Sequence, residues 1–420
     1  MELKNPAFET AVVRSFSYWE DPVYMNCRVC GAGESRKLIS LGNQPLANKY
    51  PLNEDEFLSE FSAPLDVHVC QSCLSAQIPE IHSRSEMFVD YYYLSSVNEG
   101  LDRHFCELAR ELNGSRFVVD VGSNDGVLLR HLKSEGVKFL GVDPSVNVGA
   151  IANSFGLDTL IGFFDANMVR KIREDFGQPE HIVASSVVTH LEDPQKFFLD
   201  CKKLLAQDGT LIVEIEYFGE MLSNLQFERF YFDRPHYYSL NGLDSLASKA
   251  GLTLSAVEFI AQHGGSVRAS FRHAEYASKS SEIKELLARE SAEIEQAIEV
   301  FEPSVKNECE KLVEFLEKSK AQGAKVIAYG CPARFSTITN FLTIDENLIE
   351  CVVDDSPLKA GRFSPKMHIP IVKYDIDLFK QKVAVLVFAY DYFDSIRSRI
   401  PEHVREVYRP IPFLNLLEEN

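Results

Sequence analysis

Runs of apolar residues in the middle of the chain predict a buried parallel sheet. The segment 116–121, Arg-Phe-Val-Val-Asp-Val, is short, flanked by polar residues and rich in β-branched types, as buried strands are. A turn, Gly122-Ser-Asn-Asp-Gly126, follows it, and Val-Leu-Leu-Arg-His-Leu then opens a helix. A strand, a glycine turn and a helix in that order form the crevice in which α/β sheets hold nucleosides.

Three further apolar segments continue this pattern, at 138–143, 181–186 and 209–216. The first ends in Asp143, where an acid can accept hydrogen bonds from both hydroxyls of a ribose. His190 comes just past a strand end, where catalytic groups collect in doubly wound folds. The ligand edge of the sheet is expected to present Ser185, Ser186, His190, Glu214, Glu216 and Tyr217.

The last third of the chain predicts a long helix and a second α/β unit. Apolar residues at intervals of three and four in 278–320 indicate an amphipathic linker helix, which we expect to be interrupted near Pro303. A strand, turn and helix recur at 325–333, and strands follow at 348–355 and 383–389. This unit lacks the glycine pattern of the first. Binding of a second nucleotide and a docking role without a ligand remain equal alternatives.

Four of the nine cysteines come as two pairs, Cys27-Arg-Val-Cys30 and Cys70-Gln-Ser-Cys73. Two residues between thiolates suit a knuckle that directs both sulfur atoms at one tetrahedral ion. The sequence therefore predicts a structural four-thiolate Zn²⁺ site, although the spacing between the pairs is longer than in common zinc ribbons. A zinc ribbon that binds nucleic acid is the rival interpretation, but the surrounding residues are not basic. The five single cysteines are expected to be small buried apolar residues.

Composition and charge narrow the classes of function. The chain has 420 residues, 45% of them hydrophobic and 25% charged, which is typical of a folded protein of about three domains. A net charge of −19 argues against a nucleic-acid partner. No apolar run approaches a membrane span and no secretory signal is visible, so we expect a cytoplasmic protein with reduced thiols and no membrane partner. Its oligomeric state is not predicted.

The domain organisation follows from these segments. We predict an α/β protein with a small zinc-binding domain at 1–97 and a doubly wound domain at 98–273. A helical linker at 274–322 then leads to a second, Rossmann-like domain at 323–420.

The chemistry of the first turn favours a cationic cofactor. A dinucleotide site favours Gly-x-Gly-x-x-Gly, whose glycines accommodate a pyrophosphate. Asp125 in this turn would repel a pyrophosphate, so S-adenosylmethionine fits better than a nicotinamide cofactor. The turn and the segment around Asp143 resemble the first two motifs of class I methyltransferases. The predicted cofactor-binding residues are Asp120, Gly122, Ser123, Asn124, Gly126, Asp143, Pro144 and Ser185.

Several motifs in one order resemble the zinc-containing sugar C-methyltransferases, a family that acts on nucleotide-linked keto-deoxysugars. The resemblance extends from about Cys27 to Pro412. Besides the cysteine pairs and the glycine turn, its motifs are Gln44-Pro-Leu-Ala-Asn48, Asp143-Pro-Ser-x-Asn147-Val, His263-Gly-Gly-Ser-Val-Arg268, Tyr329-Gly-Cys-Pro-Ala-Arg334, Val353-Asp-Asp-Ser-Pro-Leu-Lys-Ala-Gly-Arg362 and His368-Ile-Pro-Ile371.

The resemblance implies a zinc domain, a cofactor domain and a third domain like the second, with the sugar nucleotide held between them. It also implies a reaction in which a carbon next to a ketone loses a proton and the resulting enolate takes the methyl group. Such an enzyme supplies a base, polar groups for the oxyanion, and alignment. The substrate-binding residues expected by resemblance are Tyr91, Tyr93, His263, Tyr329, Arg334, Lys359 and Arg362.

One segment departs from the family pattern. Where the family has Tyr-x-Glu-His, this chain has Tyr231-Phe-Asp233-Arg234, and an arginine does not act as a base at neutral pH. Our hypothesis is that His190 or His236 takes the proton while Tyr231 and Arg234 steady the oxyanion. His236 would share a face with Arg234 if the segment is extended.

Three alternatives remain open. O- or N-methylation on the same scaffold needs no ketone. A non-catalytic protein that binds the cofactor or the sugar nucleotide is a candidate from another class. A nicotinamide-dependent oxidoreductase is the third.

Overall fold

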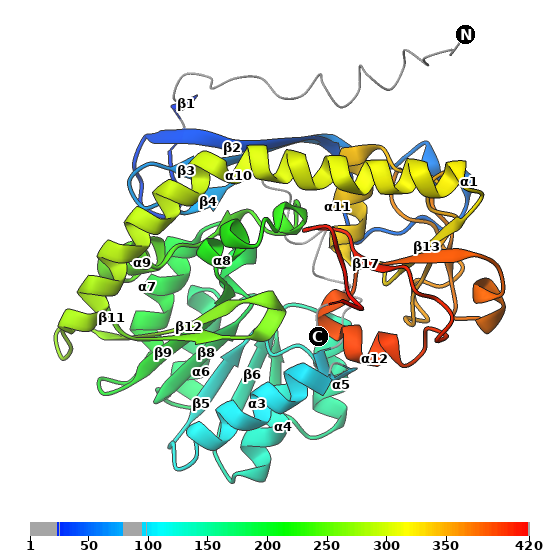
Figure 1. Cartoon of the computed structure of the whole chain (residues 1–420). Helices are drawn as coiled ribbons and strands as arrows, with labels where there is room; N and C mark the ends of the chain where they lie inside the picture. Colours follow the sequence, from blue (N-terminus) through cyan, green and yellow to red (C-terminus); the bar gives the residue numbers. More distant parts are fainter. Residues whose placement is uncertain (1–22, 25, 79–94, 98, 419–420) are drawn as a thin grey trace.

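The computed structural model describes residues 23–24, 26–78, 95–97 and 99–418, which form three sheets joined by one long helix (Figure 1). The predicted α/β class with a small N-terminal cysteine-rich unit is confirmed. Within these residues, none of the helices combines the length and the apolar character that a membrane crossing requires.

The N-terminal sheet is antiparallel and takes one strand from the middle of the chain. Its last strand, β10, pairs with β4 through His236 opposite Gln77 and Tyr237 opposite Ala76. The sheet therefore extends beyond the predicted domain 1–97. Its strands in spatial order are β1 (Val23–Tyr24), β2 (Glu34–Gln44), β3 (Ala63–Cys70), β4 (Ala76–Gln77) and β10 (His236–Tyr237), and α1 (Glu54–Phe57) lies between β2 and β3 in sequence.

The middle sheet is the predicted doubly wound one. Its strands run in the order β11-β12-β9-β8-β5-β6-β7, with β5 to β9 parallel and the β11–β12 hairpin antiparallel. The strands are β5 (Val118–Val121), β6 (Phe139–Asp143), β7 (Thr159–Ile161), β8 (His181–Ser185), β9 (Thr210–Glu216), β11 (Leu252–Ile260) and β12 (Ser266–His273).

Strands β5 and β8 in the middle of this sheet carry buried apolar residues on both faces, as expected of parallel strands covered by helices on both sides. Val119 and Ile182 face one cluster of core residues, and Val118 and Val183 face another. The helices are α3 (Glu99–Glu111), α4 (Val127–Ser134), α5 (Val146–Ser154), α6 (Ala166–Asp175), α7 (Pro194–Leu204), α8 (Phe218–Ser223) and α9 (Leu240–Ala250), with short turns η1 (Ser95–Val97), η2 (Val188–His190), η3 (Phe227–Arg229) and η4 (Gln262–Gly264).

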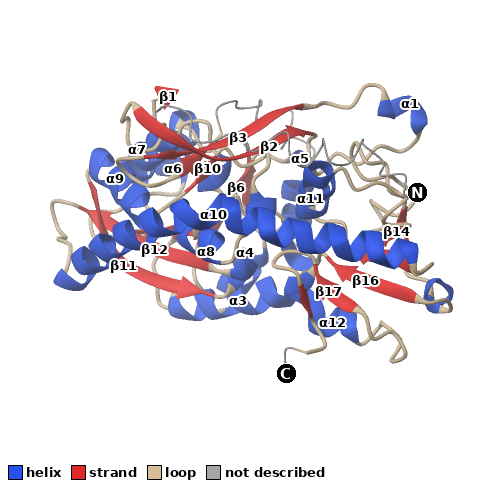
Figure 2. Cartoon of the chain, turned by 45° about the horizontal axis from the view of Figure 1, so that its top comes forward, coloured by secondary structure: helices blue, strands red, loops and turns tan. Residues whose placement is uncertain are grey.

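Helix α10 (Ser281–Ala321) spans 41 residues and runs along the whole molecule, from the side of β11 to the side of β14 (Figure 2). It contacts β2, β11 and β13, and so joins the three sheets. The expected interruption near Pro303 is wrong, because the helix continues through it. Phe301 and Val305 on either side are buried, and this packing holds the backbone helical although Pro303 donates no hydrogen bond.

The C-terminal sheet repeats the parallel architecture, as predicted, in the order β15-β14-β13-β16-β17-β18 with only β18 antiparallel. All five residues of its central strand β16 are buried. The elements are β13 (Lys325–Tyr329), α11 (Ala333–Leu342), β14 (Cys351–Val353), β15 (Ile371–Val372), η5 (Ile376–Phe379), β16 (Val383–Val387), η6 (Tyr390–Tyr392), α12 (Phe393–Arg397), β17 (Val407–Arg409) and β18 (Leu414–Asn415).

Candidate functional site

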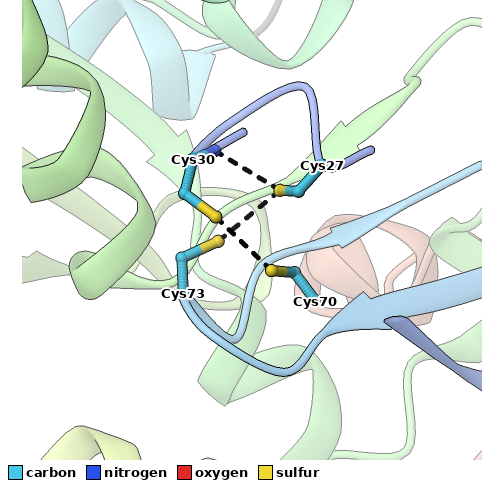
Figure 3. Close-up of side chains that lie close together, drawn as sticks. All are labelled: Cys27, Cys30, Cys70 and Cys73. Carbon is cyan, nitrogen blue, oxygen red and sulfur yellow. Dashed lines mark hydrogen bonds between the residues drawn. The ribbon is translucent and has the colours of Figure 1, made fainter. Parts of the chain in front are cut away.

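The two cysteine pairs meet at one point beside the N-terminal sheet (Figure 3). The Sγ atoms of Cys27 and Cys73 are 3.7 Å apart, those of Cys30 and Cys70 are 3.5 Å apart, and all four lie within 4.8 Å of one another. A tetrahedron with metal–sulfur bonds of about 2.3 Å has edges of about 3.8 Å. The cluster therefore fits a Zn²⁺ ion with four protein ligands and no open position.

An arginine inside the first knuckle ties this cluster to the middle of the chain. The Arg28 guanidinium donates through Nη2 to the carbonyl oxygens of Ile78 at 2.6 Å and Pro235 at 3.3 Å. The Arg28 backbone N–H donates to the Gln77 side chain at 3.1 Å. No motif in the sequence singles out Arg28.

The predicted cofactor turn folds as a cradle between β5 and α4. Gly122 and Gly126 have φ of +75° and +84°, which favours glycine, and Asn124 is left-handed as well at +49°. The Asp143 carboxylate accepts the backbone N–H groups of Asn124 at 2.9 Å and Ser145 at 2.8 Å, so it holds the turn and the start of α5 together. Pro144 lies between Asp143 and Ser145 in the chain, and Ser123 is buried in the turn.

Three carboxylates, those of Asp120, Asp143 and Glu214, lie near one another at this edge of the sheet. Burial, with the charges of Asp143 and Glu214, raises the pKa of Asp120 well above its usual range. The Glu214 carboxylate accepts hydrogen bonds from Ser185 Oγ at 2.6 Å and lies 2.9 Å from His104 Nε2. Burial opposes ionisation of Glu214, but these contacts lower its pKa to about 2. A cationic ligand would relieve the crowding of negative charge around Asp120, so the residues fit S-adenosylmethionine.

The orientation of His190 is set by one hydrogen bond. His190 Nδ1 lies 2.6 Å from the backbone oxygen of Asp233. A carbonyl oxygen only accepts, so Nδ1 carries the proton and the lone pair of the neutral ring is on Nε2. This is the tautomer in which Nε2 can take a proton from a substrate.

Tyr231 and Arg234 lie together, but the charge of Arg234 is already compensated. The Arg234 guanidinium lies 5.1 Å from the centre of the Tyr231 ring and donates to the Glu216 carboxylate. Burial opposes the charge of Arg234, yet Glu216 outweighs it and raises the pKa of Arg234. Burial also raises the pKa of Tyr231, so its phenol stays protonated and can donate to an oxyanion.

The expectation that His236 faces the cleft beside Arg234 is wrong. His236 belongs to β10 and has no exposed surface. Burial and the nearby charge of Arg28 lower its pKa to about 3. Pairing of β10 with β4 turns this side chain into the interior between the N-terminal and middle sheets, which removes it as a candidate base.

The N-terminal and C-terminal domains also supply residues to the site. Asn48 Nδ2 donates to the Asp233 carboxylate at 2.9 Å. Tyr50 Oη donates to the backbone oxygen of Cys331 at 2.8 Å, and Lys359 Nζ donates to the same oxygen at 3.0 Å. Arg362 Nη1 donates to the backbone oxygen of Tyr50 at 3.0 Å. Asn48 could have been singled out from its motif, whereas the contacts of Tyr50 have no local signal in the sequence.

An ionic network joins η3 to the C-terminal domain. Asp391 Oδ2 lies 2.5 Å from Arg334 Nη2 and 3.7 Å from Arg229 Nη2. Tyr390 Oη donates to Glu228 at 2.7 Å. The structure thus pairs the predicted substrate residue Arg334 with an acid that the sequence did not single out. Tyr329, another predicted residue, is buried, and its hydroxyl has no hydrogen-bond partner in the described part of the chain.

The substrate-binding role of all seven predicted residues stays a prediction. Tyr91 and Tyr93 lie outside the described residues, and His263 lies within η4.

Three family models match consecutive parts of the chain. A "Putative zinc binding domain" matches residues 27–88, a "Methyltransferase domain" matches 93–257, and a "C-methyltransferase C-terminal domain" matches 261–409. Among curated proteins, the chain is 28% identical over 356 residues to the C-methyltransferase NovU of Streptomyces niveus. That match covers 82% of this chain and 84% of NovU.

Solved methyltransferase structures are similar to part of the chain. The CcbJ methyltransferase of Streptomyces caelestis is 16% identical with a TM-score of 0.34, and the match covers 44% of this chain and all of CcbJ. The magnesium protoporphyrin IX methyltransferase of Synechocystis PCC 6803 is 14% identical with a TM-score of 0.32, over 41% of this chain and 83% of that one.

Proposed function

Since this chain belongs to the S-adenosylmethionine-dependent C-methyltransferases, we propose that it methylates a carbon atom of a nucleotide-linked keto-deoxysugar. The observation that carries the proposal is the hydrogen bond from His190 Nδ1 to the Asp233 backbone oxygen, because it leaves a basic nitrogen beside the segment 231–234. A base at this place is what removal of a proton next to a ketone requires.

The cofactor would lie over the turn after β5. Gly122, Asn124 and Asp143 shape this turn, and Asp120 supplies a buried carboxylate at its base. When bound there, S-adenosylmethionine supplies an electrophilic methyl group on a sulfonium sulfur. Asp143 retains lone pairs for ribose hydroxyls because each of its oxygens accepts one backbone N–H.

Proton removal and oxyanion stabilisation fall to different residues. His190 Nε2 takes the proton next to the ketone, and the imidazolium that forms is stabilised by the Asp233 carbonyl at Nδ1. Tyr231 donates its phenolic proton as a hydrogen bond to the enolate oxygen, since its raised pKa keeps it neutral. Arg234 acts through Glu216 to fix the segment rather than by steadying the oxyanion directly.

We assign the nucleotide to the side of the C-terminal domain, on which Arg334, Lys359 and Arg362 lie. Each of them contacts protein groups at present, namely Asp391, Asp354 and the Tyr50 backbone. An anionic diphosphate would compete for these cations. The four-cysteine cluster would hold a structural Zn²⁺ ion. We propose a small molecule as the binding partner, rather than a nucleic acid or a membrane. We propose a reducing, cytoplasmic location, in which the four thiols of this cluster would stay available to a metal.

A labelled methyl group tests the reaction. The protein is incubated with S-adenosylmethionine carrying a carbon-13 methyl and with nucleotide-linked 4-keto-6-deoxysugars or their reduced counterparts. We expect a methyl-on-carbon chemical shift in the product, with keto sugars only. A methoxyl or N-methyl shift, or transfer to the reduced sugars, would contradict the enolate reaction and favour O- or N-methylation. Binding of both ligands without any transfer would indicate a non-catalytic protein.

A further inference from the structure

Two parts of the N-terminal domain, strand β4 and the second cysteine knuckle, contact the segment 231–239. Its strand β10 completes the N-terminal sheet, and Ile78 after β4 donates its N–H to the Pro235 oxygen at 3.2 Å. Ser239 donates to the Cys73 oxygen, next to the second knuckle. The part of the chain that carries Tyr231 and Arg234 is therefore built onto the cysteine cluster as well as onto the cofactor domain.

Arg28 is the residue that joins the first knuckle to this segment. It lies between Cys27 and Cys30, so the position of its backbone follows from the geometry of the cluster. Its Nη2 donates to the oxygens of Ile78 and Pro235, the two residues that are also hydrogen-bonded to each other. Hydrogen bonds from a charged guanidinium are stronger than those between neutral groups. The bond to Pro235 acts on the residue that directly follows Arg234 in the chain.

A second contact carries the restraint from β10 to His190. Tyr238, which follows β10, is fully buried and donates its hydroxyl to the Val188 oxygen at 3.0 Å. Val188 and His190 form the single turn η2. His190 in turn donates to the Asp233 oxygen, so the contacts return to the segment that Arg28 holds.

We propose that Arg28 is a positioning residue for the transfer reaction: its contact with Pro235 sets the placement of segment 231–239 and thereby of His190. Arg28 lies away from the reacting groups and acts only through this segment. The inference rests on the proposed function, because that function assigns the proton transfer to His190. A misplacement of about 1 Å of a catalytic group can lower a rate by about 100-fold.

The test compares Arg28→Gln and Arg28→Lys with Arg36→Gln. Arg36 is a matched control because it lies on β2 of the same sheet and pairs with Glu299 on α10, away from segment 231–239. For each variant we would measure bound zinc, the dissociation constant for S-adenosylmethionine, kcat, KM, and amide hydrogen exchange in peptides covering 186–191 and 230–239.

For Arg28→Gln we expect zinc content and cofactor affinity as in the unaltered protein, with kcat about 10- to 100-fold lower and KM changed less than about twofold. Amide exchange should be faster in both peptides. The values for Arg28→Lys should lie between those of Arg28→Gln and those of the unaltered protein. Arg36→Gln should match the unaltered protein in every measurement. A role confined to folding of the cluster would instead alter zinc content and spread faster exchange over β2 and β3.

Normal kcat together with normal exchange in zinc-loaded Arg28→Gln would overturn the proposal. If that variant loses zinc, Arg28→Lys decides on the same two measurements. Hydrogen exchange is recorded without substrate, so it reports on the positioning role of Arg28 even if the proposed C-methylation fails. The failure of one proposal can therefore be distinguished from the failure of the other.

Discussion

His190 and His236 are both imidazoles near the same segment, and their surroundings give them opposite chemistry. His190 donates to the Asp233 oxygen and is partly exposed, whereas His236 is buried in β10 with its pKa lowered to about 3. General-base catalysis contributes about 10²- to 10⁴-fold to a rate. We therefore expect His190→Gln to lower kcat and the exchange of solvent deuterium into a keto sugar by that factor.

His236→Gln is the matched control for this substitution. It should lose stability, because a buried site is disturbed, while solvent deuterium exchange per folded molecule stays within a few-fold. Equal exchange in unaltered protein and His190→Gln would show that another group takes the proton.

Substitution of Asp120 is expected to raise the stability of the protein and to weaken cofactor binding. Its raised pKa means that the folded state holds a proton more tightly than the unfolded state. Stability is therefore lost as pH rises from the unfolded pKa through the folded one. Asp120→Asn removes this loss, so at pH 8 the cofactor-free variant should gain about 1 kcal/mol, or about 1 °C in Tm for a chain of 420 residues. The same variant should bind S-adenosylmethionine about tenfold more weakly, since about 1.4 kcal/mol of attraction to a cation disappears.

Thermal scans at pH 5 and pH 8 and calorimetric titration measure the two effects of Asp120→Asn. Asp158→Asn is a suitable control, because Asp158 is an exposed residue just before β7. A lower Tm for Asp120→Asn at pH 8, or unaltered cofactor affinity, would contradict the assignment of Asp120.

At the scale of elements, Pro303 is a strained position in an otherwise regular helix. It lies inside α10 and leaves the Glu299 carbonyl without the N–H that an ordinary residue would provide. Proline costs about 3 kcal/mol in a helix interior, and packing of α10 on three sheets offsets that cost here. We expect Pro303→Ala to raise the free energy of unfolding by about 1–3 kcal/mol. Calorimetry would report it, and a Tm equal to or below that of the unaltered protein would mean that the proline ring itself contributes to the packing of α10.

Local patterns were sufficient for most of the elements. The strands 116–121 and 383–389 were predictable because a strand buried on both faces is mostly apolar, and the unit around β13 followed from the same rule. Strand β10 was not predictable, because two residues have no periodicity and its partner β4 is remote in sequence. The course of α10 through Pro303 also depended on tertiary packing that a propensity rule ignores.

The candidate site divides in the same way. Cys27, Cys30, Gly122 and Asp143 were recognisable because their spacing within the chain is what positions a metal or a nucleoside. The placement of His236 was predicted wrongly, since its face depended on which strand it paired with. Contacts such as Asn48 with Asp233 and Arg229 with Asp391 join different domains, and no local pattern specifies them.

At the scale of the whole molecule, Asp391 is a link between the C-terminal domain and η3. Its carboxylate lies between Arg334 and Arg229, whose side chains are 12% and 5% exposed. Asp391→Asn leaves two poorly solvated guanidinium groups with less compensating charge. We expect a loss of about 2 kcal/mol, between the values for exposed and for buried ion pairs.

Differential scanning calorimetry with limited proteolysis should show that the C-terminal domain melts earlier in Asp391→Asn. Asp394→Asn, at an exposed position on α12, should leave the melting profile unaltered. Identical profiles for the two variants would mean that the network contributes nothing to holding the domains together.

The pairing of β10 with β4 has a consequence for folding during synthesis, because the ribosome makes β10 much later than β4. About 160 residues separate Gln77 from its partner His236, which corresponds to roughly 8–30 s of translation at about 5–20 residues per second. During that interval the edge of β4 has no strand to pair with, and unpaired edges invite association between nascent chains. The N-terminal sheet of this protein thus reaches its final form only after more than half of the polypeptide has been made.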